Sequence, residues 1–200
     1  MSNTARTPLP HLGKPTSELT FESVYEELVA FVWRTARRLG VEGSALDDVC
    51  QEVFVAVHRG LREYNGQGSV KTWVFGILQN SVRMHRRGQA RKDPLVRSGG
   101  NVIDAEQVSS ADRSPYELVS SAQALRIAHK ILESMGEEKR EVFVLVELEQ
   151  WSIVDAAEAI GINVNTVSAR LRAARKEFAQ AANRVRIRET LRNRDSWRPE

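Results

Sequence analysis

The stretch WSIVDAAEAIGINVNTVSARLRAARK, residues 151–176, decides the fold of the C-terminal part of this chain. Ser152 is typical of a helix N-cap, and apolar residues follow it at helical spacing, namely Ile153, Ala156, Ala157 and Ile160. Gly161 can adopt the positive φ that ends a helix at little cost. A second amphipathic segment then places Val164, Val167 and Leu171 on its inner face. Two short helices joined by a glycine predict a helix-turn-helix.

The other face of the second segment is polar and basic. Its exposed residues are expected to be Asn163, Asn165, Thr166, Ser168, Arg170, Arg172, Arg175 and Lys176. A basic second helix suits the major groove of DNA. The alternative is an ordinary helical hairpin whose arginines are solvated. No acidic residue occurs on this face before Glu177, which favours DNA binding.

Charge is unevenly distributed along the chain. The 200 residues include 28% charged residues, with a formal net charge of only +3. The charged residues of 42–52 are all acidic, namely Glu42, Asp47, Asp48 and Glu52. Those of 71–92 are all basic, namely Lys71, Arg83, Arg86, Arg87, Arg91 and Lys92. One surface should therefore repel nucleic acid and another should attract it.

Apolar periodicity predicts an all-α protein built from two small helical domains joined by a flexible linker. Helices are expected at 21–39, 44–61, 69–87, 116–135 and 137–150, before the helix-turn-helix, and Ser44 is expected to cap the second of them. The predicted organisation is a flexible N-terminal extension at 1–19, a first domain at 20–92, a linker at 93–115, a helix-turn-helix domain at 116–182 and a basic tail at 183–200.

The sequence favours neither an enzyme nor a metal or cofactor protein. Cys50 is the single cysteine, which excludes an internal disulfide and a cysteine-based zinc cluster. The histidines are scattered, at His11, His58, His85 and His129, and no nucleophile, base and orienting acid converge. No catalytic residue is therefore predicted. No apolar run approaches the roughly 20 residues that span a bilayer, so a cytoplasmic protein without membrane insertion is expected.

An acidic helix, a basic helix, a linker and a helix-turn-helix follow one another in this chain. In this order it resembles an extracytoplasmic-function (ECF) sigma factor of the sigma-70 superfamily. Residues 21–92 resemble the family's second conserved region, above all DDVCQEVFVAVHRGLREYNGQGSVKTWVFGILQNSVRMHRR at 47–87, and residues 117–182 resemble the fourth. The resemblance implies an alternative sigma factor that binds core RNA polymerase, recognises the −10 and −35 promoter elements and promotes transcription initiation.

The resemblance also implies roles for individual residues. Asp48, Gln51 and Glu52 would dock on the clamp coiled coil of the polymerase largest subunit. The single-stranded −10 element would be captured by Tyr64, Lys71, Trp73, Gln79, Asn80, Arg83, Arg86 and Arg87. The −35 element would be read as duplex by the exposed face of the second helix, from Asn163 to Lys176. Solvation of the acidic face, and packing of Trp73 in the core, remain open alternatives.

Three positions of the second helix depart from the pattern of the family. Relatives commonly have proline at the position of Asn163, a small residue at Asn165 and a basic residue at Ser168. The promoter sequence therefore cannot be transferred to this chain. The alternative function is a dimeric helix-turn-helix transcriptional regulator that is not a polymerase subunit. A protein-interaction module that titrates an inhibitor is a further alternative, and an anti-sigma factor is a possible partner.

Overall fold

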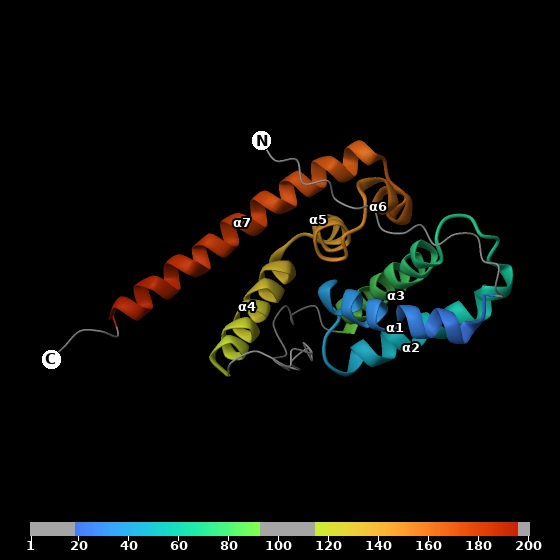
Figure 1. Ribbon diagram of the computed structural model, residues 1–200, viewed down its shortest axis with the longest axis horizontal. Coiled ribbons are helices and arrows are strands. Elements are labelled where there is room, and N and C mark those ends of the chain that lie inside the picture. The colour runs from blue at the N-terminus through green and yellow to red at the C-terminus, as the bar shows by residue number, and fades with distance from the viewer. Residues whose placement is uncertain (1–18, 93–114, 196–200) are drawn as a thin grey trace.

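The computed structural model describes residues 19–92 and 115–195, and within them every regular element is a helix (Figure 1). The first group comprises α1 (Phe21–Arg38), α2 (Ser44–Gly60), the short 3-10 turn η1 (Leu61–Glu63) and α3 (Val70–Lys92). The second comprises α4 (Pro115–Ser134), α5 (Glu137–Phe143), the π-helical turn η2 (Val144–Leu148), α6 (Ile153–Ile160) and α7 (Val164–Asp195). The predicted all-α fold is confirmed. The expected extension and linker lie almost entirely outside the described residues.

Helices α1, α2 and α3 form one bundle around a core rich in valine. Val32, Val53, Val57 and Val74 are completely buried, and β-branched side chains of this size let the three helices approach closely. Helix α2 begins differently from the prediction. The residue in the cap position is Gly43, at φ 59°, and it makes no side-chain cap hydrogen bond, so the predicted Ser44 cap is wrong. Ser44 is instead the first residue of the helix.

The predicted helix-turn-helix is formed by α6 and α7. The Ser152 hydroxyl oxygen accepts a hydrogen bond from the backbone N–H of Asp155 at 3.0 Å, which confirms Ser152 as the N-cap. Gly161 ends α6 in the left-handed conformation, at φ 73°. Val167 and Leu171 are buried as expected. Val164 is 41% exposed because it lies in the first turn of α7, so its predicted inward position is wrong.

Helix α7 is much longer than the recognition segment of the motif. It continues to Asp195, so most of the predicted basic tail is an extension of this helix (Figure 1). Its middle part packs on α4 and α5. The rings of Phe143 and Phe178 stack there, with centroids 4.9 Å apart. The extension beyond this contact projects away from the rest of the molecule (Figure 1).

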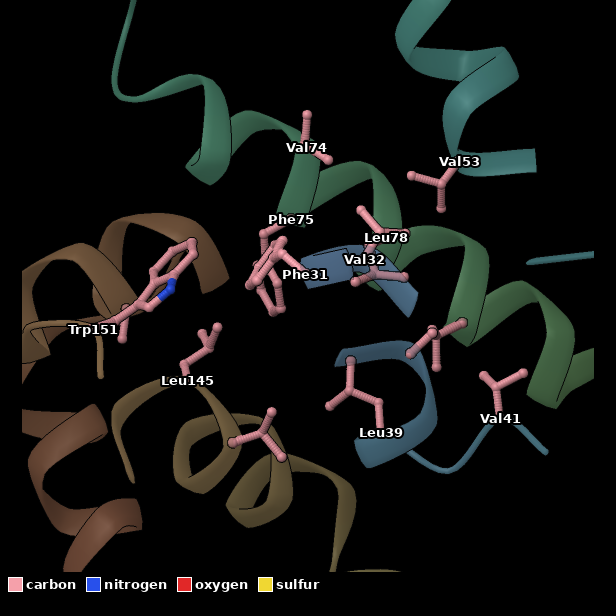
Figure 2. Close-up of a cluster of buried hydrophobic side chains, with 14 of the residues drawn as sticks. Phe31, Val32, Leu39, Val41, Val53, Val74, Phe75, Leu78, Leu145 and Trp151 are labelled. Atoms are coloured by element: carbon pink, nitrogen blue, oxygen red, sulfur yellow. The ribbon is translucent and has the colours of Figure 1, made fainter. Parts of the chain in front are cut away.

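The two helical groups share one apolar core. Trp151, which lies between η2 and α6, is 5% exposed. Its ring stacks on Phe31 of α1 at 6.0 Å between centroids and meets the edge of Phe75 of α3 at 5.6 Å. Leu145 is fully buried beside them (Figure 2). The sequence predicts two tethered domains, and their packing against each other was not expected from it.

Replacing Trp151 with alanine should strongly destabilise the chain. The change empties a ring-sized site that is lined by both helical groups, and such truncations cost about 3–5 kcal/mol of unfolding free energy. Urea denaturation followed by circular dichroism measures the loss. Val154→Ala is the matched control, because Val154, the second residue of α6, is 61% exposed. Equal stabilities of the two variants would contradict the shared core.

Candidate nucleic-acid interface

The acidic face of α2 is open to solvent. Asp48, Gln51 and Glu52, the three residues predicted to bind a partner, are all exposed. Together with Val55, which is 48% exposed, they line a shallow groove. Arg59 lies further along the same groove. The structure thus brings the three predicted residues together on one accessible surface with an apolar centre, an arrangement that suits docking of a basic helix.

Two aromatic residues stand at the start of α3. The rings of Tyr64 and Trp73 lie 5.1 Å apart. The Tyr64 hydroxyl donates a hydrogen bond to the Gly68 carbonyl at 2.9 Å, which fixes the loop between them. Trp73 also covers Gly60, where a Cβ would lie 3.0 Å from its ring. Both aromatic side chains are half-buried, so Trp73 combines packing with partial accessibility.

Lys71 is enclosed by aromatic rings from both helical groups. Its Nζ lies 4.6 Å from the centroid of the Phe31 ring and 5.3 Å from that of Trp151. These distances are typical of cation–π contacts. Burial lowers the pKa of the Lys71 ammonium, and the negative charge of Glu149 partly opposes that shift. Of the residues predicted to bind the −10 strand, Lys71 is thus one that already has partners.

The basic part of α3 faces acidic residues of α5. Arg83 lies 3.7 Å from the Glu137 carboxylate and 3.4 Å from that of Glu141, and Arg86 lies 3.3 Å from Glu137. Burial raises the pKa of the Glu141 carboxyl, while the Arg83 charge opposes this shift. Gln79 is only 6% exposed.

Two further residues of the predicted −10 set lie on α3, namely Asn80 and Arg87, and both are exposed. The structure therefore divides this set. Asn80 and Arg87 are accessible, whereas Lys71, Gln79, Arg83 and Arg86 contact the second helical group.

A third acidic residue, Glu149, joins the second helical group to α1. Its carboxylate accepts two hydrogen bonds from Arg34, at 3.1 and 2.9 Å, and one from Arg38 at 2.5 Å. The side chain of Glu149 is 3% exposed, so the charge is neutralised by two guanidinium groups in a nearly dry site. None of Glu137, Glu141 and Glu149 was predicted from the sequence to have a role. Glu137 begins the charged segment EEKREVF and Glu149 follows the last residue of η2, so local sequence gives no signal of the pairing.

The predicted DNA-binding residues of the helix-turn-helix lie on one surface at the start of α7. Those that are exposed are Asn163, Asn165, Thr166, Arg172, Arg175 and Lys176. The Asn163 side-chain oxygen accepts the backbone N–H of Asn165 at 2.7 Å, so Asn163 caps α7. Ser168 is half-buried, and its hydroxyl donates to the Val164 carbonyl at 3.0 Å.

Two arginines of this surface are paired with acidic residues of their own domain. Arg170 lies 2.8 Å from the Glu138 carboxylate, and Arg175 donates to Glu147 at 2.9 Å. Arg172 and Lys176 have no such pair in the described part of the chain, and their positive charges are exposed to solvent. The arrangement suits insertion of the start of α7 into a major groove.

One cluster at the junction of the two helical groups contains possible metal ligands. The ligand atoms of Glu42, His129 and Glu133 all lie within 4.8 Å of one another. Burial lowers the pKa of His129. Burial, followed by the neighbouring Glu42, raises the pKa of the Glu133 carboxyl to about 7. No metal site is predicted from the sequence, in which Glu42 lies in a different segment from His129 and Glu133.

Comparison with known proteins identifies the family. Residues 24–92 match the Sigma-70 region 2 family, and residues 125–178 match the Sigma-70, region 4 family. The chain belongs to the sigma-70 family. Within that family it is an ECF sigma factor, an alternative sigma factor that acts in transcription initiation. The same comparisons do not favour the dimeric transcriptional regulator considered as an alternative.

Relatives of this sigma factor match most of its length. It is 28% identical over 141 residues to the ECF RNA polymerase sigma-E factor of Escherichia coli K12, covering 68% of this chain and 73% of that protein. The corresponding protein of Haemophilus influenzae is 27% identical over 140 residues, with 68% and 74% covered.

Solved structures share the fold of this sigma factor. The sigma factor RpoE of Bartonella quintana, solved with the anti-sigma factor NepR, aligns with a TM-score of 0.68 at 20% identity, over 82% of this chain and 96% of that one. CnrH, solved with the cytosolic domain of CnrY, aligns with a TM-score of 0.56 at 22% identity, over 82% and 87%. Within residues 19–92 and 115–195 of this sigma factor, no helix is both long enough and apolar enough to cross a membrane.

Glu133 should make stability depend on pH. Its pKa is raised from 4.5 to about 7 in the fold, so the folded chain binds this proton more tightly than the unfolded chain. Stability should therefore be lost as pH rises from about 4.5 to 7. Glu133→Gln cannot ionise, so its advantage over wild type in unfolding free energy should grow across that range. Urea titrations at several pH values measure this.

The matched control for this prediction is Glu26→Gln on α1, because Glu26 is exposed. Only the Glu133 variant should gain stability relative to wild type as pH rises. His129 titrates in the opposite sense, since burial lowers its pKa. Because its Nε2 lies 3.2 Å from the Glu133 carboxylate, the comparison is repeated in a His129→Gln background, where only the carboxyl differs. A Glu133→Gln advantage that does not grow with pH would contradict the assignment.

Proposed function

We propose that this sigma factor directs core RNA polymerase to promoters by dividing three contacts among its helices. The exposed face of α2 binds the polymerase, α3 captures the −10 strand, and the start of α7 reads the −35 duplex. The observation that supports this division is spatial. An acidic groove, a basic helix and a basic helix-turn-helix occupy three different surfaces, within the segments that match regions 2 and 4.

The polymerase contact is assigned to Asp48, Gln51 and Glu52, and its partner is the clamp coiled coil of the largest subunit. A groove with carboxylates on its rim and exposed Val55 within it combines charge with an apolar centre. Charges at the rim orient a basic partner, and they increase its association rate more than its affinity. The apolar centre supplies the desolvated contact.

The −10 contact is assigned to the loop and helix from Tyr64 to Arg87. Opening a duplex and extruding a base costs a few kcal/mol. Stacking on an aromatic ring offsets about 1–3 kcal/mol per base, and the half-exposed Tyr64 and Trp73 pair offers such a surface. Asn80 is exposed and supplies an amide for a base edge. The arginines of α3 bind the backbone phosphates.

The −35 contact is assigned to the exposed residues of α7 between Asn163 and Lys176. Asparagine pairs with adenine and arginine pairs with guanine in the major groove. Asn165 and Arg172 are the exposed residues of those types with side chains free for such contacts. Asn163 is engaged in capping the helix, so it positions α7 and contacts the DNA backbone.

The domain assignment follows from these contacts. Residues 20–92 form the domain for the polymerase and the −10 element, 116–182 the domain for the −35 element, and 93–115 the linker. The polymerase performs the phosphoryl chemistry, and this chain is a non-enzymatic subunit that acts in the cytoplasm. The RpoE neighbour described above was determined with the anti-sigma factor NepR, and an anti-sigma factor is a proposed partner of this chain.

Reconstitution tests the proposal directly. The chain is mixed with core RNA polymerase and genomic DNA, and the 5′ ends of the transcripts are sequenced. We expect a set of start sites that appears only when the chain is present and shares two upstream elements. Tight binding of the isolated chain to a palindromic duplex, without new start sites, would instead support a dimeric regulator.

Replacing both Asp48 and Glu52 with lysine should weaken binding to core polymerase by tenfold or more. The two lysines would repel the basic partner that the carboxylates attract. Circular dichroism should remain unchanged, because both side chains are exposed. Glu22→Lys with Glu26→Lys is the matched control, with the same charge change on exposed positions of α1. Fluorescence anisotropy with labelled polymerase measures affinity. Equal loss in both double variants would contradict the assignment.

Arg172→Ala should cost about 1–3 kcal/mol of affinity for the cognate −35 duplex if Arg172 contacts a base. The preference for the cognate sequence should fall at one position. Binding is compared across single-base variants of the element, with holoenzyme. Arg184→Ala serves as the control, because Arg184 lies on α7 beyond the region 4 match. A uniform loss on all sequences would make Arg172 a phosphate contact.

A further inference from the structure

One histidine and two glutamates converge where the two domains of this sigma factor meet. The Nε2 atom of His129 lies 3.5 Å from the Glu42 carboxylate and 3.2 Å from the Glu133 carboxylate. The ligand atoms of all three residues lie within 4.8 Å of one another. His129 and Glu133 are four positions apart on α4, whereas Glu42 lies in the connection between α1 and α2. The cluster is therefore formed by both domains together.

The separations of these atoms suit a tetrahedral metal ion. Zn²⁺ binds imidazole nitrogen and carboxylate oxygen at about 2.0–2.2 Å, so two ligand atoms of a tetrahedral site lie about 3.3–3.5 Å apart. The two distances from the His129 Nε2 atom are close to this length. The carboxylate oxygens of Glu42 and Glu133 lie no more than 4.8 Å apart, which a small rotation of two partly exposed side chains can adjust.

One guanidinium group holds the backbone around the cluster. Arg140 donates hydrogen bonds to the carbonyls of Leu39 at 3.0 Å, Glu133 at 2.6 Å and Met135 at 2.9 Å. Gly40, at φ 94°, permits this close approach, because a Cβ there would lie 2.5 Å from Nη1 of Arg140. The ends of α1 and α4 are thus fixed relative to each other. A fixed backbone favours metal binding, since the ligands need little further ordering.

The charges around the cluster favour a metal that binds imidazole strongly. Burial lowers the pKa of His129, so its ring is neutral near pH 7 and can offer a lone pair. Positive charges also lie nearby, on Arg37, Lys130 and Arg140, and they weaken the attraction of the two carboxylates for any cation. Ions that bind through charge alone are therefore disfavoured relative to Zn²⁺, which forms strong bonds to imidazole.

We propose that Glu42, His129 and Glu133 form a Zn²⁺ site that links the two domains, with a water molecule as the fourth ligand. Three protein ligands and one open position are typical of zinc sites that solvent can reach. The His129 side chain is 25% exposed and both glutamate side chains are 37% exposed, so the ion can enter from solvent. Because folding brings the three ligands together, zinc should stabilise the folded chain.

Isothermal titration of the full-length, chelator-treated chain with zinc chloride tests the site. A slightly alkaline buffer keeps both carboxylates ionised, as metal binding requires. Glu42→Gln, His129→Gln and Glu133→Gln should each weaken zinc binding by more than about 100-fold, beyond the 10- to 100-fold effect of residues that only support a ligand. Glu133→His should retain binding, because two histidines four positions apart on a helix bind zinc from one face.

Matched controls separate this site from a general loss of histidine or charge. His58→Gln changes an exposed histidine of α2, and Glu138→Gln changes an exposed glutamate of the second domain, so neither should alter zinc affinity. Mg²⁺ and Ca²⁺ should bind far more weakly than Zn²⁺, because both prefer sites made of oxygen ligands. Co²⁺ in place of Zn²⁺ should show the visible absorption of tetrahedral coordination in wild type, and His129→Gln should lose it.

Thermal unfolding followed by circular dichroism measures the effect of zinc on the fold. A free Zn²⁺ concentration one hundred times the Kd should multiply the ratio of folded to unfolded chain by about 100. The unfolding midpoint of wild type should therefore rise with zinc concentration, and that of His129→Gln should not. Spectra recorded without zinc show whether each variant has kept its helices.

Any of three results would overturn the proposal. The first is a zinc affinity that is equal in wild type and in all three glutamine variants, which would make the ion adventitious. The second is full retention of binding in Glu42→Gln, which would confine the site to α4 and remove the link between the domains. The third is equal affinity for Zn²⁺, Mg²⁺ and Ca²⁺, which would show attraction of charge without a coordination site.

Discussion

The arrangement of the two domains depends on the placement of one indole ring. The chain turns sharply before Trp151, where Gln150 adopts a φ of 58°, and the backbone N–H of Trp151 donates to the Leu145 carbonyl at 3.0 Å. This turn directs the ring out of its own domain and against Phe31 and Phe75 of the other (Figure 2). Because aromatic burial supplies much of the stabilisation at such contacts, the ring fixes the separation at which the charged residues around it meet.

The charged residues at the interface between the two domains range from buried to exposed. The Glu149 side chain is almost completely enclosed, whereas that of Glu137 is 44% exposed. Desolvated pairs are specific but costly to break, and exposed pairs are weak and sensitive to salt. The same interface thus contains ion pairs that define the arrangement and ion pairs that salt weakens.

Local signals in the sequence predicted the local structure well. Ser152 and Gly161 define the ends of α6 through hydrogen bonding and backbone conformation that depend on neighbouring residues alone. The interface between domains could not be predicted in this way. Glu149 and Arg34 are 115 residues apart, and apolar periodicity shows which face of a helix is buried without showing its partner. Gln79 illustrates the result, since it was expected at a DNA surface and is enclosed beside Glu141.

Helix α7 gives the molecule a rigid arm. It continues from the end of the region 4 match at residue 178 to Asp195, and at about 1.5 Å per residue these 17 residues span about 25 Å. A helix of this length keeps a fixed direction relative to the motif it extends. A fluorophore attached near residue 195 would therefore report the orientation of the recognition helix on DNA, because the helix does not move independently of the motif.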